Sequence, residues 1–120
     1  MPIRNFLKTE PRIAPCHDGE GLVKMASIYK KEDFSTPLQF IHYTVLPPKT
    51  SIGLHKHGNN EEVYIIIEGS GIMEVDGEKT PVSEGDTILN RPLGSHALYN
   101  TSDDNELKIL VFEVRMAESS

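Results

Sequence analysis

Residues 55–69 have the sequence HKHGNNEEVYIIIEG, which carries most of the information about the fold and the site. His55 and His57 are separated by one residue, so on a β-strand both imidazoles lie on one face and can approach one point. The turn signal Gly58-Asn59-Asn60 follows, and Glu62 comes directly before an apolar run. The stretch therefore predicts two consecutive strands that place a carboxylate beside a pair of histidines.

The apolar run over residues 63–67 is predicted to form a strand in a barrel wall. With a period of two, Glu62, Tyr64 and Ile66 face the interior, and the alternate residues of the run face the opposite side. Both faces are then apolar, which is typical of a strand that is buried on both sides.

Glycine, proline, asparagine and aspartate divide the rest of the chain into short segments, with little room for a helix longer than about three turns. Short strands at this spacing indicate an all-β sandwich or barrel. The predicted strands span residues 23–29, 38–46, 52–57, 63–68, 71–75, 79–82, 87–90, 96–100 and 107–114.

A third histidine, His96, follows a turn at residues 91–95 and begins another predicted strand. Three neutral imidazoles and one carboxylate suit Mn, Fe, Ni, Co, Zn or Cu at bond lengths of ~2.0–2.2 Å, with positions left for water and substrate. The alternative is a solvated face, because histidines two residues apart on a strand often serve no ligand role. Spacing alone leaves both interpretations open.

The arrangement resembles the first motif of the cupin superfamily. That motif is a His-x-His, three or four residues, a Glu, six residues and a Gly, and it is matched by His55, His57, Glu62 and Gly69. Lys49 occupies the position of the glycine that usually stands six residues before the first histidine.

A second stretch resembles the second cupin motif, which is a Gly, five residues, Pro-x-Gly, two residues, a His, three residues and an Asn. Gly85, His96 and Asn100 match it. Arg91 and Leu93 stand where the Pro and the Gly are expected, so we expect a differently shaped turn before His96, with the ligand itself retained.

This resemblance spans residues 38–114 and implies an all-β cupin jelly-roll β-barrel, also called a double-stranded β-helix. It implies one divalent transition metal (Mn, Fe, Ni, Co, Zn or Cu) bound by His55, His57, Glu62 and His96. It also implies a metal-dependent enzyme of the dioxygenase, decarboxylase or isomerase class, acting on a small polar or acidic metabolite. The alternatives are a non-catalytic metabolite- or sugar-binding module and a metal-free barrel with a structural or regulatory role.

Three further residues are candidate catalytic groups, each with an ordinary structural alternative. Tyr64 can donate a hydrogen bond to a bound substrate, or be a core tyrosine with a satisfied hydroxyl. Arg91 can pair with a carboxylate or enediolate, or be a solvated loop residue. His42 can be a proton shuttle or a donor to a metal ligand, or an ordinary packed histidine.

Composition excludes several classes of protein. The chain has 120 residues, enough for one domain, and its 12 Lys and Arg against 18 Asp and Glu give a net charge of −6. That charge disfavours a nucleic-acid or anionic-membrane surface and favours a small-molecule substrate. The single cysteine, Cys16, excludes an internal disulfide, and the longest apolar run has only five residues, so we expect a cytoplasmic protein without a membrane span.

We expect an N-terminal arm over residues 1–22, a cupin domain over residues 23–115 and a frayed tail over residues 116–120. The arm has three prolines and weak periodicity, so it is expected to lie on the barrel or on a partner subunit. A homodimer is predicted, in which the arm of one subunit covers a sheet edge of the other. Nothing in the sequence distinguishes Cys16 or His17 as site residues.

Overall fold

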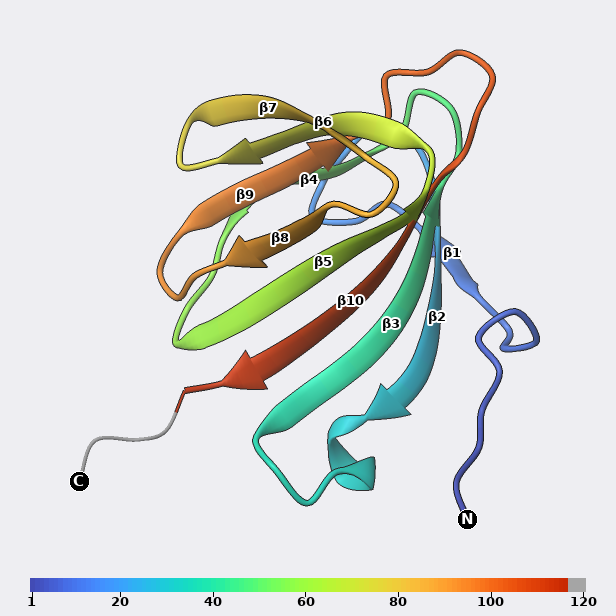
Figure 1. Cartoon of the computed structure of the whole chain (residues 1–120), viewed down its shortest axis with the longest axis vertical. Helices are drawn as coiled ribbons and strands as arrows, with labels where there is room; N and C mark the ends of the chain where they lie inside the picture. Colours follow the sequence, from blue (N-terminus) through green and yellow to red (C-terminus); the bar gives the residue numbers. More distant parts are fainter. Residues whose placement is uncertain (117–120) are drawn as a thin grey trace.

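The computed structural model describes residues 1–116 and contains ten β-strands in two antiparallel sheets, with one 3₁₀ turn at Lys31–Asp33 (Figure 1). The six-stranded sheet has the order β1-β2-β3-β10-β5-β8, and the four-stranded sheet has the order β4-β9-β6-β7. The strands are β1 (Arg12–Ala14), β2 (Val23–Lys30), β3 (Leu38–Leu46), β4 (Ser51–Lys56), β5 (Asn60–Glu68), β6 (Ser70–Val75), β7 (Glu78–Ser83), β8 (Thr87–Asn90), β9 (Ser95–Tyr99) and β10 (Leu107–Arg115). The predicted all-β class is confirmed.

Each of the nine predicted strands forms, with its ends within three residues of the prediction. The tenth strand, β1, was not predicted, because its three residues lie between Pro11 and Pro15 and show no usable alternation. Of the tail predicted over residues 116–120, only Met116 belongs to the described residues. The other four positions lie outside them.

The core lies between the two sheets. It is built from the inward-facing residues, which alternate with outward-facing ones along each strand. On β5 the alternation puts Tyr64 and Ile66 inside, as predicted, at 2% and 1% exposure. The largest fully buried side chains come from both sheets, which places the barrel interior between them. The core cluster consists of Val23, Leu46, Ile52, Tyr64, Ile66, Met73, Val82, Leu98, Leu107, Ile109 and Val111.

The first residues of the chain pack on the outer face of the six-stranded sheet of the same chain. The ring of Phe6 packs on that of Tyr43 on β3, with centroids 4.4 Å apart. Arg4 forms an ion pair with Asp33 at 3.0 Å, which ties the arm to the turn after β2. Further along the arm, β1 pairs with β2 and so extends the six-stranded sheet. The N-terminal arm is therefore in contact with the barrel of its own chain.

After β1 the chain crosses to the edge of the four-stranded sheet as a short strap (residues 16–20). The backbone N–H of Gly53 donates to the carbonyl of Cys16, and that of Ser51 donates to the carbonyl of Glu20, both at 3.0 Å. The strap thus links the N-terminal segment to β4, the strand that leads into the His-x-His motif.

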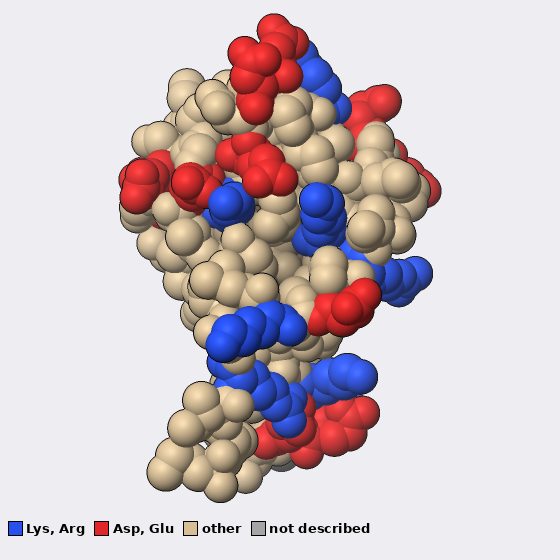
Figure 2. Space-filling model, turned by 90° about the vertical axis from the view of Figure 1, so that its right-hand side faces the viewer, with Lys and Arg blue, Asp and Glu red and all other residues tan. Residues whose placement is uncertain are grey.

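The side of the molecule that carries β1 and β2 shows both signs of charge. Asp and Glu side chains are more frequent toward the upper end of this face, and Lys and Arg side chains toward its middle and lower part, with some of each sign among the other (Figure 2). Among residues 1–116, no helix has the length and apolar character needed to cross a membrane.

Candidate functional site

Four side chains from the facing sheets converge inside the barrel. His55 lies on β4 and His96 on β9, at paired positions of the four-stranded sheet. Glu62 lies on β5 of the other sheet, and His57 follows the end of β4, held by a 2.9 Å hydrogen bond from its N–H to the carbonyl of Gly94. The predicted strand continued through His57, but β4 ends at Lys56. The side chain still reaches the interior.

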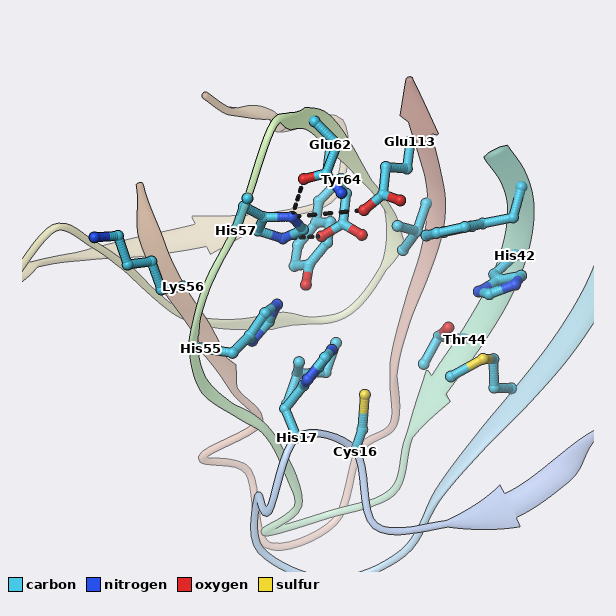
Figure 3. Close-up of a pocket in the computed structure, with 16 residues that line it drawn as sticks. Cys16, His17, His42, Thr44, His55, Lys56, His57, Glu62, Tyr64 and Glu113 are labelled. Atoms are coloured by element: carbon cyan, nitrogen blue, oxygen red, sulfur yellow. Dashed lines mark hydrogen bonds and ion pairs between the residues drawn. The ribbon is translucent and has the colours of Figure 1, made fainter. Parts of the chain in front are cut away.

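The potential ligand atoms of these four residues all lie within 4.8 Å of one another. Oε1 of Glu62 is 3.2 Å from Nε2 of His57 (Figure 3) and 3.0 Å from Nε2 of His96, and the two nitrogens are 3.2 Å apart. Ligands bound at right angles to one ion with bonds of ~2.0–2.2 Å would lie about 3 Å apart. The observed spacings match that value.

The outer nitrogens of two histidines are held so that the inner nitrogens face the cluster. Nδ1 of His55 donates to the carbonyl of Gly53 at 2.8 Å, and Nδ1 of His57 donates to Oδ1 of Asn60 at 2.7 Å. This tautomer leaves a lone pair on each Nε2. Nε2 of His55 is buried without a hydrogen-bond partner among residues 1–116. Lone pairs facing a carboxylate are unfavourable unless a cation or a proton lies between them, so the cluster fits a metal ion.

The surroundings favour the ligand form of Glu62 and His55, whereas they shift His57 toward its protonated form. Burial acts to raise the pKa of Glu62, but hydrogen bonds and charge from His57 and His96 lower it to about 2, so the carboxylate is ionised at neutral pH. Burial lowers the pKa of His55 to about 4, so its imidazole is neutral. The hydrogen bond with Glu62 raises the pKa of His57, because it stabilises the charged imidazolium.

A cavity of about 350 Å³ opens in front of the cluster (Figure 3). Tyr64 lines it, with its hydroxyl 3.2 Å from Nε2 of His96, and burial raises its pKa well above 10. Tyr64 therefore stays a hydrogen-bond donor at neutral pH. The remaining lining residues are Cys16, His17, Met25, Phe40, His42, Thr44, Ile52, His55, Lys56, His57, Gly58, Asn60, Glu62, Val111 and Glu113.

His42, another predicted catalytic candidate, lies on β3 and also lines this cavity. Its ring stacks on that of Phe40, with centroids 4.0 Å apart, and burial lowers its pKa. Figure 3 places it on the wall opposite His55 and His57. His42 therefore lies among the cavity residues but outside the ligand cluster.

Arg91 and Asn90 are not among the residues that line this cavity. Arg91 is exposed and borders a separate hollow of about 220 Å³, together with Asn90, Asp76 and His96. Asn90 is buried, and neither atom of its amide has a hydrogen-bond partner among residues 1–116. The loop that carries Arg91 thus directs it away from the cavity in front of the cluster.

Glu113 is a cavity residue that the sequence reasoning missed. It lies on β10 opposite Glu62, and its Oε1 is 3.5 Å from Nδ1 of His57. Burial raises the pKa of Glu113, with a further contribution from the charge of Glu62. Alternation along β10 from the buried Ile109 and Val111 would have predicted its inward direction.

Cys16 and His17 also line the cavity, although nothing in the sequence distinguished them. Both lie on the strap, and the ring of His17 stacks on that of His55. Burial raises the pKa of the Cys16 thiol. No local sequence signal marks either residue, because they reach the site through the long-range contact between the strap and β4.

Comparisons with known proteins agree with this geometry. A family model described as Cupin domain matches residues 42–113. A Thermotoga maritima protein named oxalate-binding protein is 33% identical over 103 residues, covering 86% of this chain and 85% of that protein. An uncharacterized protein of Methanocaldococcus jannaschii is 40% identical over 111 residues, covering 92% and 87%. The crystal structure of a predicted oxalate decarboxylase from Thermotoga maritima has a TM-score of 0.92 at 28% identity, covering 96% of this chain and 100% of that one.

Proposed function

Because the chain belongs to the cupin family, we propose that it binds a small acidic metabolite of the oxalate class at a divalent transition metal held by His55, His57, Glu62 and His96. The jelly-roll barrel implied by the two motifs is confirmed by the family match and by the solved structure. The observation that carries the proposal is the convergence of three imidazole nitrogens and one ionised carboxylate inside the barrel, three of which line the cavity.

Charge favours an acid over a neutral ligand in this cavity. A bound divalent ion supplies positive charge that holds and polarises substrate oxygens. Glu62 provides one negative charge against the two positive charges of such an ion, so the ion and its four ligands together keep about one net positive charge that a carboxylate can neutralise. The second carboxyl group of the cavity, Glu113, has a pKa that burial raises, which opposes its ionisation. The net charge of −6 opposes the binding of an acid only at long range, since salt screens it beyond ~8 Å. The naming of the Thermotoga relative as an oxalate-binding protein supports the same ligand class.

Calorimetric titration of the manganese-loaded protein tests the proposal. Oxalate is expected to bind at least about tenfold more tightly than oxamide, its uncharged counterpart of the same shape, because charged oxygens form the stronger contacts. Protein stripped with a chelator is expected to give no binding heat with either compound. Equal affinities for the acid and the amide would show that the cavity does not select anions.

Turnover of the bound acid is the second candidate function, and the ionisable groups around the cluster favour it. Tyr64 remains protonated and can donate a hydrogen bond to a substrate oxygen, while Glu113 has a raised pKa and can exchange a proton inside the cavity. His42 stays neutral on the opposite wall. Decarboxylase, dioxygenase and isomerase reactions each need such groups beside a metal. Consumption of the acid by metal-loaded protein distinguishes catalysis from binding alone.

We also propose a homodimer, formed by the outer face of the six-stranded sheet. Val63 pairs with Phe112 and Ile65 with Leu110, and all four are only partly buried in the single chain. The arm covers the face of β2 and β3, so this apolar area on β5 and β10 remains for a second copy.

Light scattering at ~100 μM is expected to give a dimer mass, because a stable pair has a far lower dissociation constant. Ile65→Lys is expected to give a monomer. Thr80→Lys, on the exposed part of β7 in the other sheet, provides the matched control and should remain a dimer. A monomer mass for the unchanged protein would contradict the dimer.

A further inference from the structure

The strap is fastened to β4 by several independent contacts. Besides the two hydrogen bonds from Gly53 and Ser51, the hydroxyl of Ser51 accepts a 2.8 Å hydrogen bond from the N–H of Glu20. A Cβ at Gly19 would overlap the carbonyl oxygen of Ser51, so the two backbones approach more closely than side chains permit. The strap therefore has a defined position on the edge of the barrel.

Two consecutive residues of the strap adopt a backbone conformation that costs free energy. His17 has a φ of 49° and Asp18 a φ of 57°, both in the left-handed region, which residues with a Cβ disfavour. Such conformations persist only where the surrounding contacts impose them, and they cluster at functional sites. With the backbone in this conformation, the imidazole of His17 points into the cavity.

Inside the cavity, His17 covers one face of the metal-ligand candidate His55. The two rings are stacked, with centroids 3.5 Å apart and planes 9° from parallel (Figure 3). His55 is only half-buried, and its Nδ1 donates to Gly53. The rings of His96 and His57 also lie near it, with centroids 4.3 and 5.1 Å away, but both are inclined to its plane. His17 is the neighbour that lies flat against the ring face, so it restricts tilting about the hydrogen bond.

We propose that His17 is a positioning residue for His55: stacking holds the imidazole so that its buried, unpartnered Nε2 points at the other three ligand atoms. This inference rests on the proposed metal site. His17 itself is not one of the four clustered groups, so it acts through His55 and not as a ligand.

The test measures metal affinity for two replacements of His17. His17→Ala removes the stacked ring and is expected to weaken Co²⁺ binding roughly threefold to tenfold, the size of an aromatic pair interaction. His17→Phe keeps a flat ring but no nitrogen, and is expected to bind Co²⁺ within about twofold of the unchanged protein. The visible absorption spectrum of bound Co²⁺ reports the ligand geometry, so it should change in His17→Ala and be retained in His17→Phe.

A double-mutant cycle shows whether the effect passes through His55. In a His55→Ala background, His17→Ala is expected to change Co²⁺ affinity less than about twofold, because the ring it positions is gone. Equal affinities of His17→Ala and the unchanged protein, or a His17→Phe variant as weak as His17→Ala, would overturn the positioning role. Failure of the unchanged protein to bind Co²⁺, Mn²⁺ or Zn²⁺ would instead overturn the metal site, and the role of His17 with it.

Discussion

Glu62→Gln is expected to weaken divalent-metal binding by more than about 100-fold while the barrel stays folded. Glu62 is the only carboxylate in the four-residue cluster, and hydrogen bonds with His57 and His96 hold its pKa at about 2 in spite of burial. Glutamine has nearly the same shape but no charge. The three imidazoles alone then have to hold the ion without a negative partner.

Glu61→Gln is the matched control for this change. It removes the same charge one residue earlier on β5, where alternation places the side chain on the opposite face. The unchanged protein and Glu61→Gln are expected to carry close to one metal ion per chain by elemental analysis. A competition titration with a chelator gives the affinities. Retention of full affinity in Glu62→Gln would show that the ion, if bound, does not use this carboxylate.

Gly53→Ala is expected to lower the free energy of unfolding of the metal-free protein by about 3 kcal/mol, at the upper end of ordinary overpacking costs. A Cβ at Gly53 would overlap the carbonyl oxygen of His17 and approach the backbone nitrogen of Gly19. Both neighbours are backbone atoms of the strap, so no side-chain rotation can relieve the clash. The strap has to move away from β4 and lose its hydrogen bonds.

Gly58→Ala provides the control, since a Cβ at Gly58 would meet nothing within 4 Å. Its unfolding free energy is expected to stay within about 0.5 kcal/mol of the unchanged protein. Urea denaturation followed by circular dichroism measures both variants. Equal stabilities for Gly53→Ala and Gly58→Ala would mean that the strap is not tightly packed on β4 in solution.

Local patterns in the sequence were sufficient for nine of the ten strands, and the resemblance to the two cupin motifs named the four residues of the main cluster. Alternation with a period of two gave the inward direction of Tyr64 and Ile66, and it would also have revealed Glu113. The same rule predicted that His55 and His57 share a face, and both reach the cluster although β4 ends before His57. These predictions succeeded because strand direction depends on nearest neighbours along the chain.

Contacts between segments that are far apart in the sequence could not be predicted from local sequence patterns. The strap brings Cys16 and His17 to the cavity through backbone bonds to β4, more than thirty residues further along the chain. The loop before His96 carries Arg91 to a separate hollow, although Arg91 is close to the ligand in sequence. Loop direction depends on packing against other segments, and residue spacing does not encode it.

The sequence by itself therefore determined the all-β class and the alternation of inside and outside on each strand, because these depend on short-range periodicity. Its resemblance to the two cupin motifs named the four residues that converge in the barrel. Only the tertiary structure decided which more distant side chains share the cavity, such as His42 from β3 and His17 from the strap. Their positions result from how the two sheets and the N-terminal segment pack against each other, and that packing is a property of the whole folded chain.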